Sequence, residues 1–187
     1  MRRMPVWLIL GVALLLTGCG SGVAAHSSPS PTPSPTPTVL SQRQQLVLYL
    51  REFKKYANRE GALVASEKRL FKTTGGMHQG DDFSAPRARM LKIARKFNAL
   101  SVDCAAMDPP QCVAGSHKLF VRCLRNAYLA DLAYCDYLGT SAKGVSVGQR
   151  AVKLTTLAER EYLAWSFSLR VTAKKLHVRI PFHIGET

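Results

Sequence analysis

The sequence predicts an all-α domain in which four helices form an antiparallel four-helix bundle. Between residues 40 and 187, apolar side chains recur at helical spacing in four separate stretches. Segments that contain glycine or proline divide these stretches, and no neighbouring pair of short alternating segments indicates a β-sheet. The connections are short, which favours the packing of consecutive helices in opposite directions.

The composition divides the chain into three parts. Arg2 and Arg3 precede an apolar run of about eleven residues, which is shorter than the roughly twenty that a membrane-spanning helix needs. We therefore interpret residues 1–18 as a signal peptide for export. Residues 19–39 are rich in Pro, Ser and Thr and carry no charge, so they are predicted to form a disordered linker. Residues 40–187 are the predicted helical domain.

The predicted signal peptide ends in Leu16-Thr17-Gly18-Cys19, which resembles the lipobox of bacterial lipoproteins. The resemblance implies cleavage between Gly18 and Cys19 and attachment of a diacylglycerol to the Cys19 sulfur. It also implies a protein held at the extracytoplasmic side of a cell membrane by this lipid anchor. Gly20 is not the aspartate associated with retention at an inner membrane, so an outer-membrane location fits a cell with two membranes. Several acyl chains hold a protein far more firmly than one.

The first two helices have clear start and stop signals. Ser41 and Gln44 match a capping box at the start of the first helix, which Thr73-Thr74-Gly75-Gly76 ends. Ser84 opens the second helix after the acidic pair Asp81-Asp82, whose charge suits the positive end of the helix dipole. The prolines at 109 and 110 end it, because proline removes a backbone donor and blocks the preceding turn.

The third and fourth helices complete the predicted bundle. The third runs from about residue 110 to residue 138 and is followed by a glycine. The fourth starts at a second capping-box match, Ser146 with Gln149, and ends near His177. Residues 178–184 are short, β-branched and interrupted by proline, so we expect an extended tail.

Four cysteines follow the linker, and export permits disulfides between them. Cys123 and Cys135 are twelve residues apart on one predicted helix, hence about 18 Å along its axis. Bridged cysteines need Cα atoms closer than roughly 7 Å, so these two are expected to be buried thiols. Cys104 and Cys112 flank the proline turn, and we predict a disulfide between them. The spacing typical of zinc ligands is absent, so no metal site is predicted.

Two polar residues, His117 and Asp131, fall on the apolar stripe of the third helix. They are fourteen residues apart, or about 21 Å along the axis, so they cannot form one site. We expect each to pair with a polar group on a neighbouring helix, because buried polar groups need partners. The alternative is that one of them contacts a ligand.

The charge of the chain indicates its partners. Basic residues number 26 against 12 acidic ones, and loss of Arg2 and Arg3 with the signal peptide would leave a net charge near +12. Such a field beside a membrane should attract anionic lipid, cell-wall polyanions or acidic envelope proteins. Nucleic acid also suits a pI near 10, but export and the absence of a nucleic-acid-binding motif disfavour it.

These observations predict a binding or structural role at the cell envelope for a basic, lipid-anchored helical domain. No catalytic residue and no cofactor are predicted, because no di-iron, haem-attachment or phosphate-loop pattern occurs. The alternative is an envelope enzyme or small-ligand binder with an unfamiliar site in the bundle core. Such a site would use Asp131, His117 or the tyrosines 128, 134 and 137, and would need a concave pocket.

Overall fold

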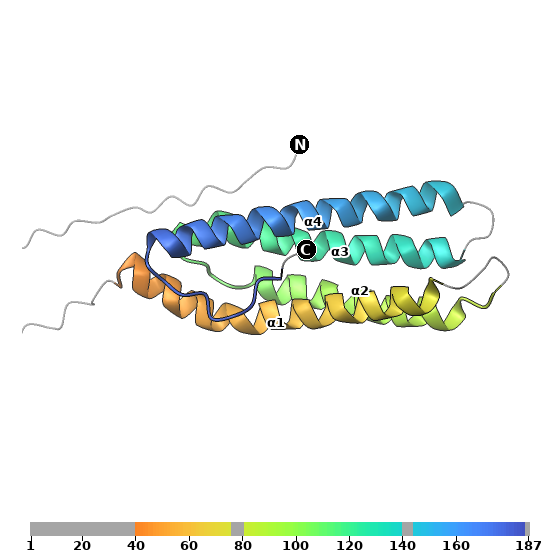
Figure 1. Cartoon of the computed structure of the whole chain (residues 1–187), viewed down its shortest axis with the longest axis horizontal. Coiled ribbons are helices and arrows are strands. Elements are labelled where there is room, and N and C mark those ends of the chain that lie inside the picture. The colour runs from red at the N-terminus through yellow and green to blue at the C-terminus, as the bar shows by residue number, and fades with distance from the viewer. Residues whose placement is uncertain (1–39, 76–80, 140–143, 186–187) are drawn as a thin grey trace, which may run out of the picture. The chain divides into compact units, whose positions relative to one another are not determined.

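The computed structural model describes residues 40–75, 81–139 and 144–185, and these ranges form an all-helical domain without strands (Figure 1). The predicted all-α class is therefore confirmed for this part of the chain. The predicted signal peptide, Cys19 and the linker lie outside the described residues. The helices are α1 (Gln42–Thr74), α2 (Ser84–Ala105), α3 (Ala114–Gly139) and α4 (Gly144–Lys175), with a short 3-10 turn, η1 (Gln111–Val113), before α3.

Sequence signals were used to predict the starts of α1, α2 and α4. The structure agrees with them at α1 and α2 but not at α4. At α1, the Gln44 amide donates to Ser41 Oγ at 3.3 Å and the Ser41 amide donates to Gln44 Oε1 at 2.8 Å, which confirms the capping box. At α2, the Ser84 amide donates to Asp82 Oδ1 at 2.8 Å. The second predicted capping box is wrong, because α4 already begins at Gly144 and Ser146 lies inside its first turn.

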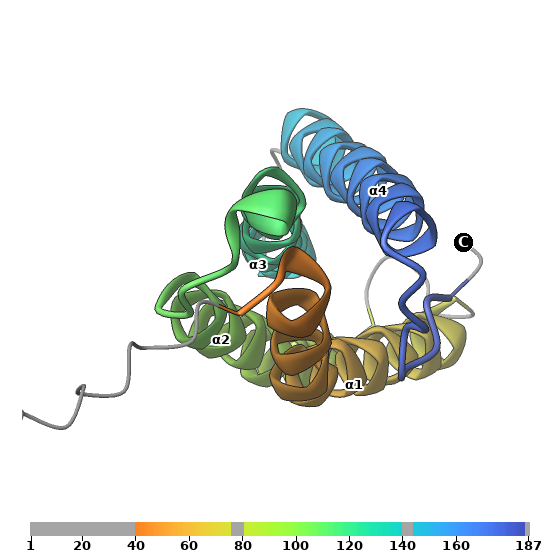
Figure 2. The same cartoon turned by 90° about the vertical axis from the view of Figure 1, so that its left-hand side faces the viewer.

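Each helix packs chiefly against the next one in the chain: α1 against α2, α2 against α3, and α3 against α4. Figure 2, which looks along the helices, shows α1 and α4 apart, with the segment that follows α4 crossing between them. Side chains fill the interior at the centre of this arrangement. The rings of Phe53 (α1), Phe120 (α3) and Trp165 (α4) meet there, with centroid distances of 4.9 Å for Phe53–Phe120 and 4.6 Å for Phe120–Trp165.

The end of α4 turns the chain back toward α1. His177 has a φ of 52°, in the left-handed region, and the Val178 amide donates to the Ala173 carbonyl at 2.9 Å. These features define a Schellman end, with His177 in the position that glycine usually takes. The chain then continues as an irregular tail, residues 178–185, as the sequence predicted.

The tail belongs to the core. The Phe182 ring lies 5.8 Å from the Phe53 ring of α1, and Ile184 is buried. Arg170 of α4 donates to the Ile184 carbonyl at 3.3 Å. The tail therefore covers the side of the domain on which the ribbons of α1 and α4 lie apart, beside the Phe53–Trp165 ring contact of 5.9 Å that joins the two helices (Figure 2).

The predicted Cys104–Cys112 disulfide is not present, because all four cysteines of the described residues are free thiols. Cys104 lies in the last turns of α2 with its side chain completely buried in the core, whereas Cys112 is in η1 and only half-buried. Symmetry about a proline turn brings two backbone segments near each other. It does not turn both side chains toward a common point, which a disulfide requires.

Candidate functional site

The two polar residues predicted on the third helix both lie in α3 and are both buried, His117 at 4 % and Asp131 at 3 % exposure. Each meets a residue of α1, as expected. The Tyr49 hydroxyl and His117 Nδ1 are 3.0 Å apart, and Asp131 forms a hydrogen bond with the Glu67 side chain. The structure therefore keeps the two residues in separate polar contacts rather than in one site.

The His117 contact is a packing feature of the core. Burial lowers the pKa of His117, although the nearby backbone carbonyl of Cys104 acts in the opposite direction, and burial raises the pKa of Tyr49. Both side chains are therefore neutral at pH 7. The His117 ring also lies 6.2 Å from the Phe53 ring in an edge-to-face arrangement. This contact joins α1 to α3 through one polar bond inside an aromatic cluster.

Asp131 belongs to a carboxylate cluster that the sequence analysis missed, formed with Glu60 and Glu67 of α1. A repeat of seven residues places Glu60 and Glu67 on the same line of α1 as the buried Leu46 and Phe53. A heptad repeat marks the side of a helix that faces its neighbours. A search for charged residues at these positions would have found both glutamates.

Burial controls the protonation of this cluster. It raises the pKa of Glu60 to about 7, with the charge of Glu67 acting in the same direction. Burial and Glu67 together raise the pKa of Asp131, and burial also raises that of Glu67. Ionised carboxylates only accept hydrogen bonds, so the Glu67–Asp131 bond requires a proton between them. We assign that proton to Asp131.

Two neighbouring groups connect the cluster to α4 and the tail. Glu161 of α4 accepts from Arg122 Nε at 3.0 Å and from Asn126 Nδ2 at 2.7 Å, both on α3. The Tyr162 hydroxyl bonds the backbone of Gly185 in the tail, and burial beside Glu60 raises its pKa to about 12. The tail therefore lies over the carboxylate cluster. Within the described residues, no three His, Cys, Asp or Glu side chains are placed to hold a metal ion.

A second polar feature is a basic groove on the surface between α1 and α2. The hollow has a volume of about 340 Å³, and Leu70 and Ile93 form its apolar floor. Its remaining lining residues are two hydroxyl side chains and four cations: Ser66, Thr73, Arg69, Arg89, Lys92 and Lys96. The hydroxyls of Ser66 and Thr73 donate to backbone carbonyls of α1. No acidic residue lines the basic groove.

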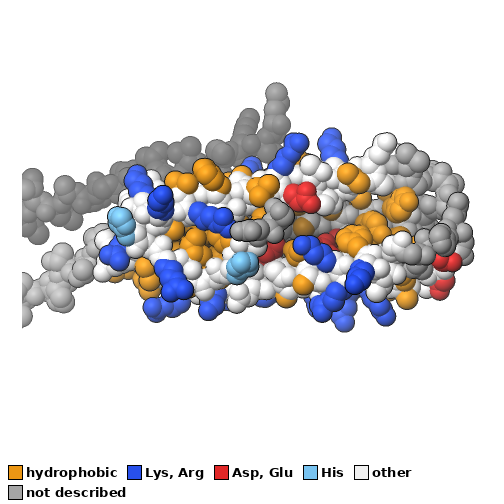
Figure 3. Space-filling view, viewed as in Figure 1, with side chains coloured by type: hydrophobic (Ala, Val, Ile, Leu, Met, Phe, Trp, Pro, Cys, Tyr) orange, Lys and Arg blue, Asp and Glu red, His pale blue; other side chains and the backbone are white. Residues whose placement is uncertain are grey.

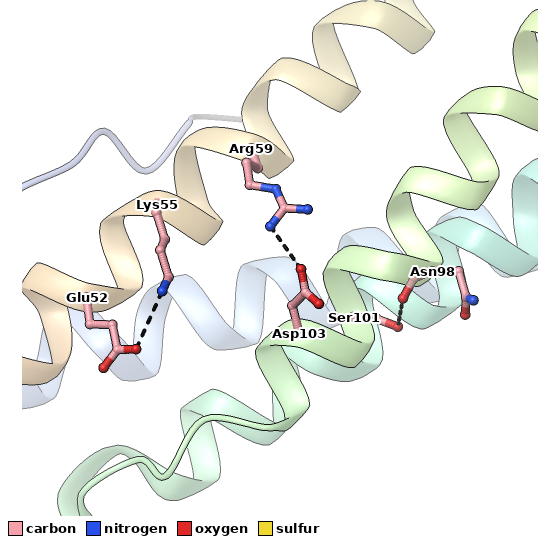
Figure 4. A network of polar contacts seen from close by, with 6 residues as sticks. All are labelled: Glu52, Lys55, Arg59, Asn98, Ser101 and Asp103. Atoms are coloured by element: carbon pink, nitrogen blue, oxygen red, sulfur yellow. Dashed lines mark hydrogen bonds and ion pairs between the residues drawn. The ribbon is translucent and has the colours of Figure 1, made fainter.

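Two exposed acids, Glu52 and Asp103, pair with cations outside the groove. Figure 4 shows Glu52 beside Lys55, at 3.6 Å, and Asp103 of α2 reaching Arg59 of α1, at 3.0 Å. Within residues 40–75, 81–139 and 144–185, ion pairs form at Lys55, Arg59 and Arg122 but at none of the four groove cations. Figure 3 shows Lys and Arg side chains spread over one face of the domain with few acids among them. The basic groove is therefore the candidate functional site.

In the part of the chain that the structure describes, no helix has both the length and the hydropathy needed to cross a bilayer. Comparison of the chain with known protein families, with characterised proteins and with solved structures finds no match.

Proposed function

We propose that this chain is an exported, lipid-anchored protein whose helical domain binds a polyanionic surface of the cell envelope. Its helices form an antiparallel four-helix bundle, a topology supported by the packing of each helix on the next and by the short connections. The observation that carries the binding role is the basic groove, where four exposed cations form no ion pair with the residues that the structure describes. Phosphate and carboxylate groups are the ligands that such an arrangement favours.

The carboxylate cluster strengthens this interpretation. Of the twelve acidic residues, Asp131 is buried, and Glu60 and Glu67 are half-buried. A fourth, Glu161, has both oxygens engaged by α3. The surface is therefore more positive than the overall composition indicates. The attraction extends about a Debye length, roughly 8 Å at physiological salt.

The anchor has a direct test. The wild-type protein, expressed with a clickable fatty acid, should incorporate the label, and a Cys19→Ser variant should not, because the serine oxygen does not replace the sulfur that accepts the lipid. Labelling of the variant at the wild-type level would show that Cys19 is not the lipidated residue.

The role of the groove is tested with substitutions that remove positive charge without introducing negative charge. One variant carries Arg89→Gln, Lys92→Gln and Lys96→Gln. A control with the same loss of charge carries Arg51→Gln, Lys54→Gln and Arg125→Gln, three exposed cations outside the groove. Binding is measured over a salt series to anionic vesicles, to neutral vesicles and to a soluble polyphosphate.

We expect the groove variant to lose binding to the anionic targets by about tenfold or more and the control to lose much less, since each cation near an anionic surface contributes about 1 kcal/mol. The three targets distinguish a lipid from a polymer partner. Equal binding of wild type to anionic and neutral vesicles, together with no binding to polyphosphate, would contradict the proposed function.

A ligand site in the core has less support. The hollows between α1 and α2 and at the start of α1 are not lined by Asp131, His117 or the three tyrosines. Tyr134 packs its ring against Phe71 at 4.9 Å and against Tyr137 at 6.1 Å. We therefore do not propose an enzymatic role.

A further inference from the structure

Helix α4 exposes a line of large apolar side chains on the side that faces away from the core. Leu163, Phe167 and Val171 recur every four residues and are 51 %, 71 % and 50 % exposed. Val152, about three turns before Leu163, is 67 % exposed and lies on the same side of the helix. At 100° per residue these four side chains fall within about 60° of Phe167. We call this side the α4 outer face.

The α4 outer face also carries cations and no acid. Lys153, Arg160 and Lys174 are exposed and lie within about 60° of Phe167 on the helical projection. The acid of α4 nearest in angle is Glu159, about 80° away. Figure 3 shows hydrophobic and basic side chains next to each other along the upper edge of the domain, where α4 lies. Apolar and cationic residues therefore share one surface.

Folding does not require this apolar line. The opposite side of α4 provides the core contacts through residues such as Ala158, Trp165 and Leu169, all of them buried. Trp165 and Phe167 are two residues apart and so point in nearly opposite directions. An exposed phenylalanine flanked by leucine and valine on a helix that already buries its other side indicates a binding surface.

We propose that the α4 outer face docks on the anionic surface of a lipid bilayer. Phe167, with Leu163 and Val171, enters the boundary between headgroups and acyl chains, while the three cations contact lipid phosphates. Helices that lie in a membrane interface combine these two kinds of residue in this way. The inference rests on the proposed function, since it names the lipid surface as the partner of the basic domain.

Charge favours lipid over a second copy of the chain. In a symmetric dimer through this face, Lys153, Arg160 and Lys174 of one copy would face the same three residues of the other. Such a contact brings six cations together without an acid. An anionic membrane neutralises them instead.

The length of the chain between Cys19 and the domain also fits. Figure 1 shows that α1 begins at the same end of the domain at which α4 ends, close to the Phe167 and Val171 end of the outer face. Residues 20–39 would extend about 60 Å as an extended linker, whereas α4, with 32 residues, is about 48 Å long. A lipid at Cys19 therefore leaves enough chain for α4 to lie flat on the same membrane.

The test uses the chain from residue 19 onward with Cys19→Ser, which keeps the linker and the helical domain but removes the lipid. Binding to vesicles of phosphatidylglycerol with phosphatidylcholine is compared among wild type, Phe167→Ser, Leu163→Ser and the control Val102→Ser. Val102 is an apolar residue on α2 whose exposure, 61 %, lies between those of Leu163 and Phe167. Circular dichroism checks that each variant is folded.

We expect Phe167→Ser and Leu163→Ser to bind about tenfold more weakly and Val102→Ser to bind as wild type does. Independently, the fluorescence that Phe167→Trp adds to that of the buried Trp165 should be quenched by brominated acyl chains. Wild-type binding by both apolar variants, or an unquenched tryptophan, would overturn the docking of α4.

The outcomes separate this inference from the proposed function. If the groove variant loses binding to anionic vesicles while the α4 variants keep it, the docking of α4 is wrong and the proposed function stands. If the wild type binds neither vesicles nor polyphosphate, both are wrong. If the wild type sediments as a dimer that Phe167→Ser dissociates, a second copy occupies the face, which overturns lipid docking.

Discussion

The Glu67 carboxyl of α1 and the Asp131 carboxyl of α3 share a hydrogen bond inside the helical domain. One Asp131 oxygen, Oδ2, is fully buried and has no hydrogen-bond partner among the described residues. The bond exists only while one of the two groups is protonated, because two ionised carboxylates repel each other and neither can donate a hydrogen bond. The folded state therefore holds at least one protonated carboxyl group, and the free energy of unfolding of the domain depends on pH.

A Glu60→Gln variant should remove part of this pH dependence. Burial raises the pKa of Glu60 from 4.5 to about 7, so the folded state holds a proton that the unfolded state releases. The wild-type stability is then complete below about pH 4.5 and is lost as the pH rises through about 7. We expect urea unfolding to give similar free energies for both proteins at pH 5, and a value for the variant that is higher by about 2–3 kcal/mol at pH 8.

The control for this measurement is Glu52→Gln, an exposed acid beside Lys55. His117, whose lowered pKa acts in the opposite sense below about pH 6.5, is common to all the proteins and cancels in the differences. The same difference between wild type and Glu60→Gln at pH 5 and pH 8 would show that Glu60 is not buried in the folded state.

Tyr49→Phe should destabilise the domain by about 1 kcal/mol at pH 7. The substitution keeps the ring and its packing but leaves His117 Nδ1, 3.0 Å from the missing oxygen, without its partner. Tyr137→Phe, at a residue 44 % exposed, provides the comparison and should have little effect. A double-mutant cycle with His117→Ala isolates the bond, and a coupling energy near zero would contradict the contact.

The four cysteines of the helical domain should differ in their reactivity toward iodoacetamide. Burial raises the pKa of Cys104 to about 12 and that of Cys135 to about 11, and Cys123 shifts in the same direction. Cys112 is only half-buried. Mass spectrometry of the compact unit, residues 38–187, should therefore find modification at Cys112 first, and at all four after denaturation. Rapid modification of Cys104 in the folded protein would contradict its place in the core.

Ile184→Ala should cost about 2 kcal/mol of stability, although the residue lies outside the four helices. Its side chain is only 6 % exposed, and its removal leaves a cavity under the tail. Val102→Ala, at an exposed site on α2, removes similar atoms and should change the urea midpoint little. Equal midpoints for wild type and Ile184→Ala would mean that the tail does not pack on the core.

The sequence predicted those features that depend on local patterns. Helical periodicity and the Ser41 capping box are local, and both agree with the structure. The Ser146 capping box is a local pattern too, but it does not mark the start of α4, because Gly144 and Val145 already belong to the helix. A sequence motif gives only a preference for a boundary, and the surrounding chain decides the register.

Contacts between distant residues were not accessible from local patterns. The pairing of His117 and Asp131 with neighbouring helices was predicted, but their partners Tyr49 and Glu67 are 68 and 64 positions away in the chain. Likewise, residues 178–184 were predicted as a tail, while the packing of Phe182 against Phe53 joins residues that are 129 positions apart in the chain. The prediction of a Cys104–Cys112 disulfide was wrong because the spacing of two cysteines in the sequence does not show in which direction their side chains point.

The tail has a consequence for the order in which the protein is made. Ile184 and Phe182 leave the ribosome after all four helices, yet they pack on a core that contains Leu46, which is synthesised more than a hundred residues earlier. A nascent chain, or a product truncated before residue 178, has its helices but lacks the segment between α1 and α4. We expect such a chain to remain loosely folded and to be cut readily by proteases.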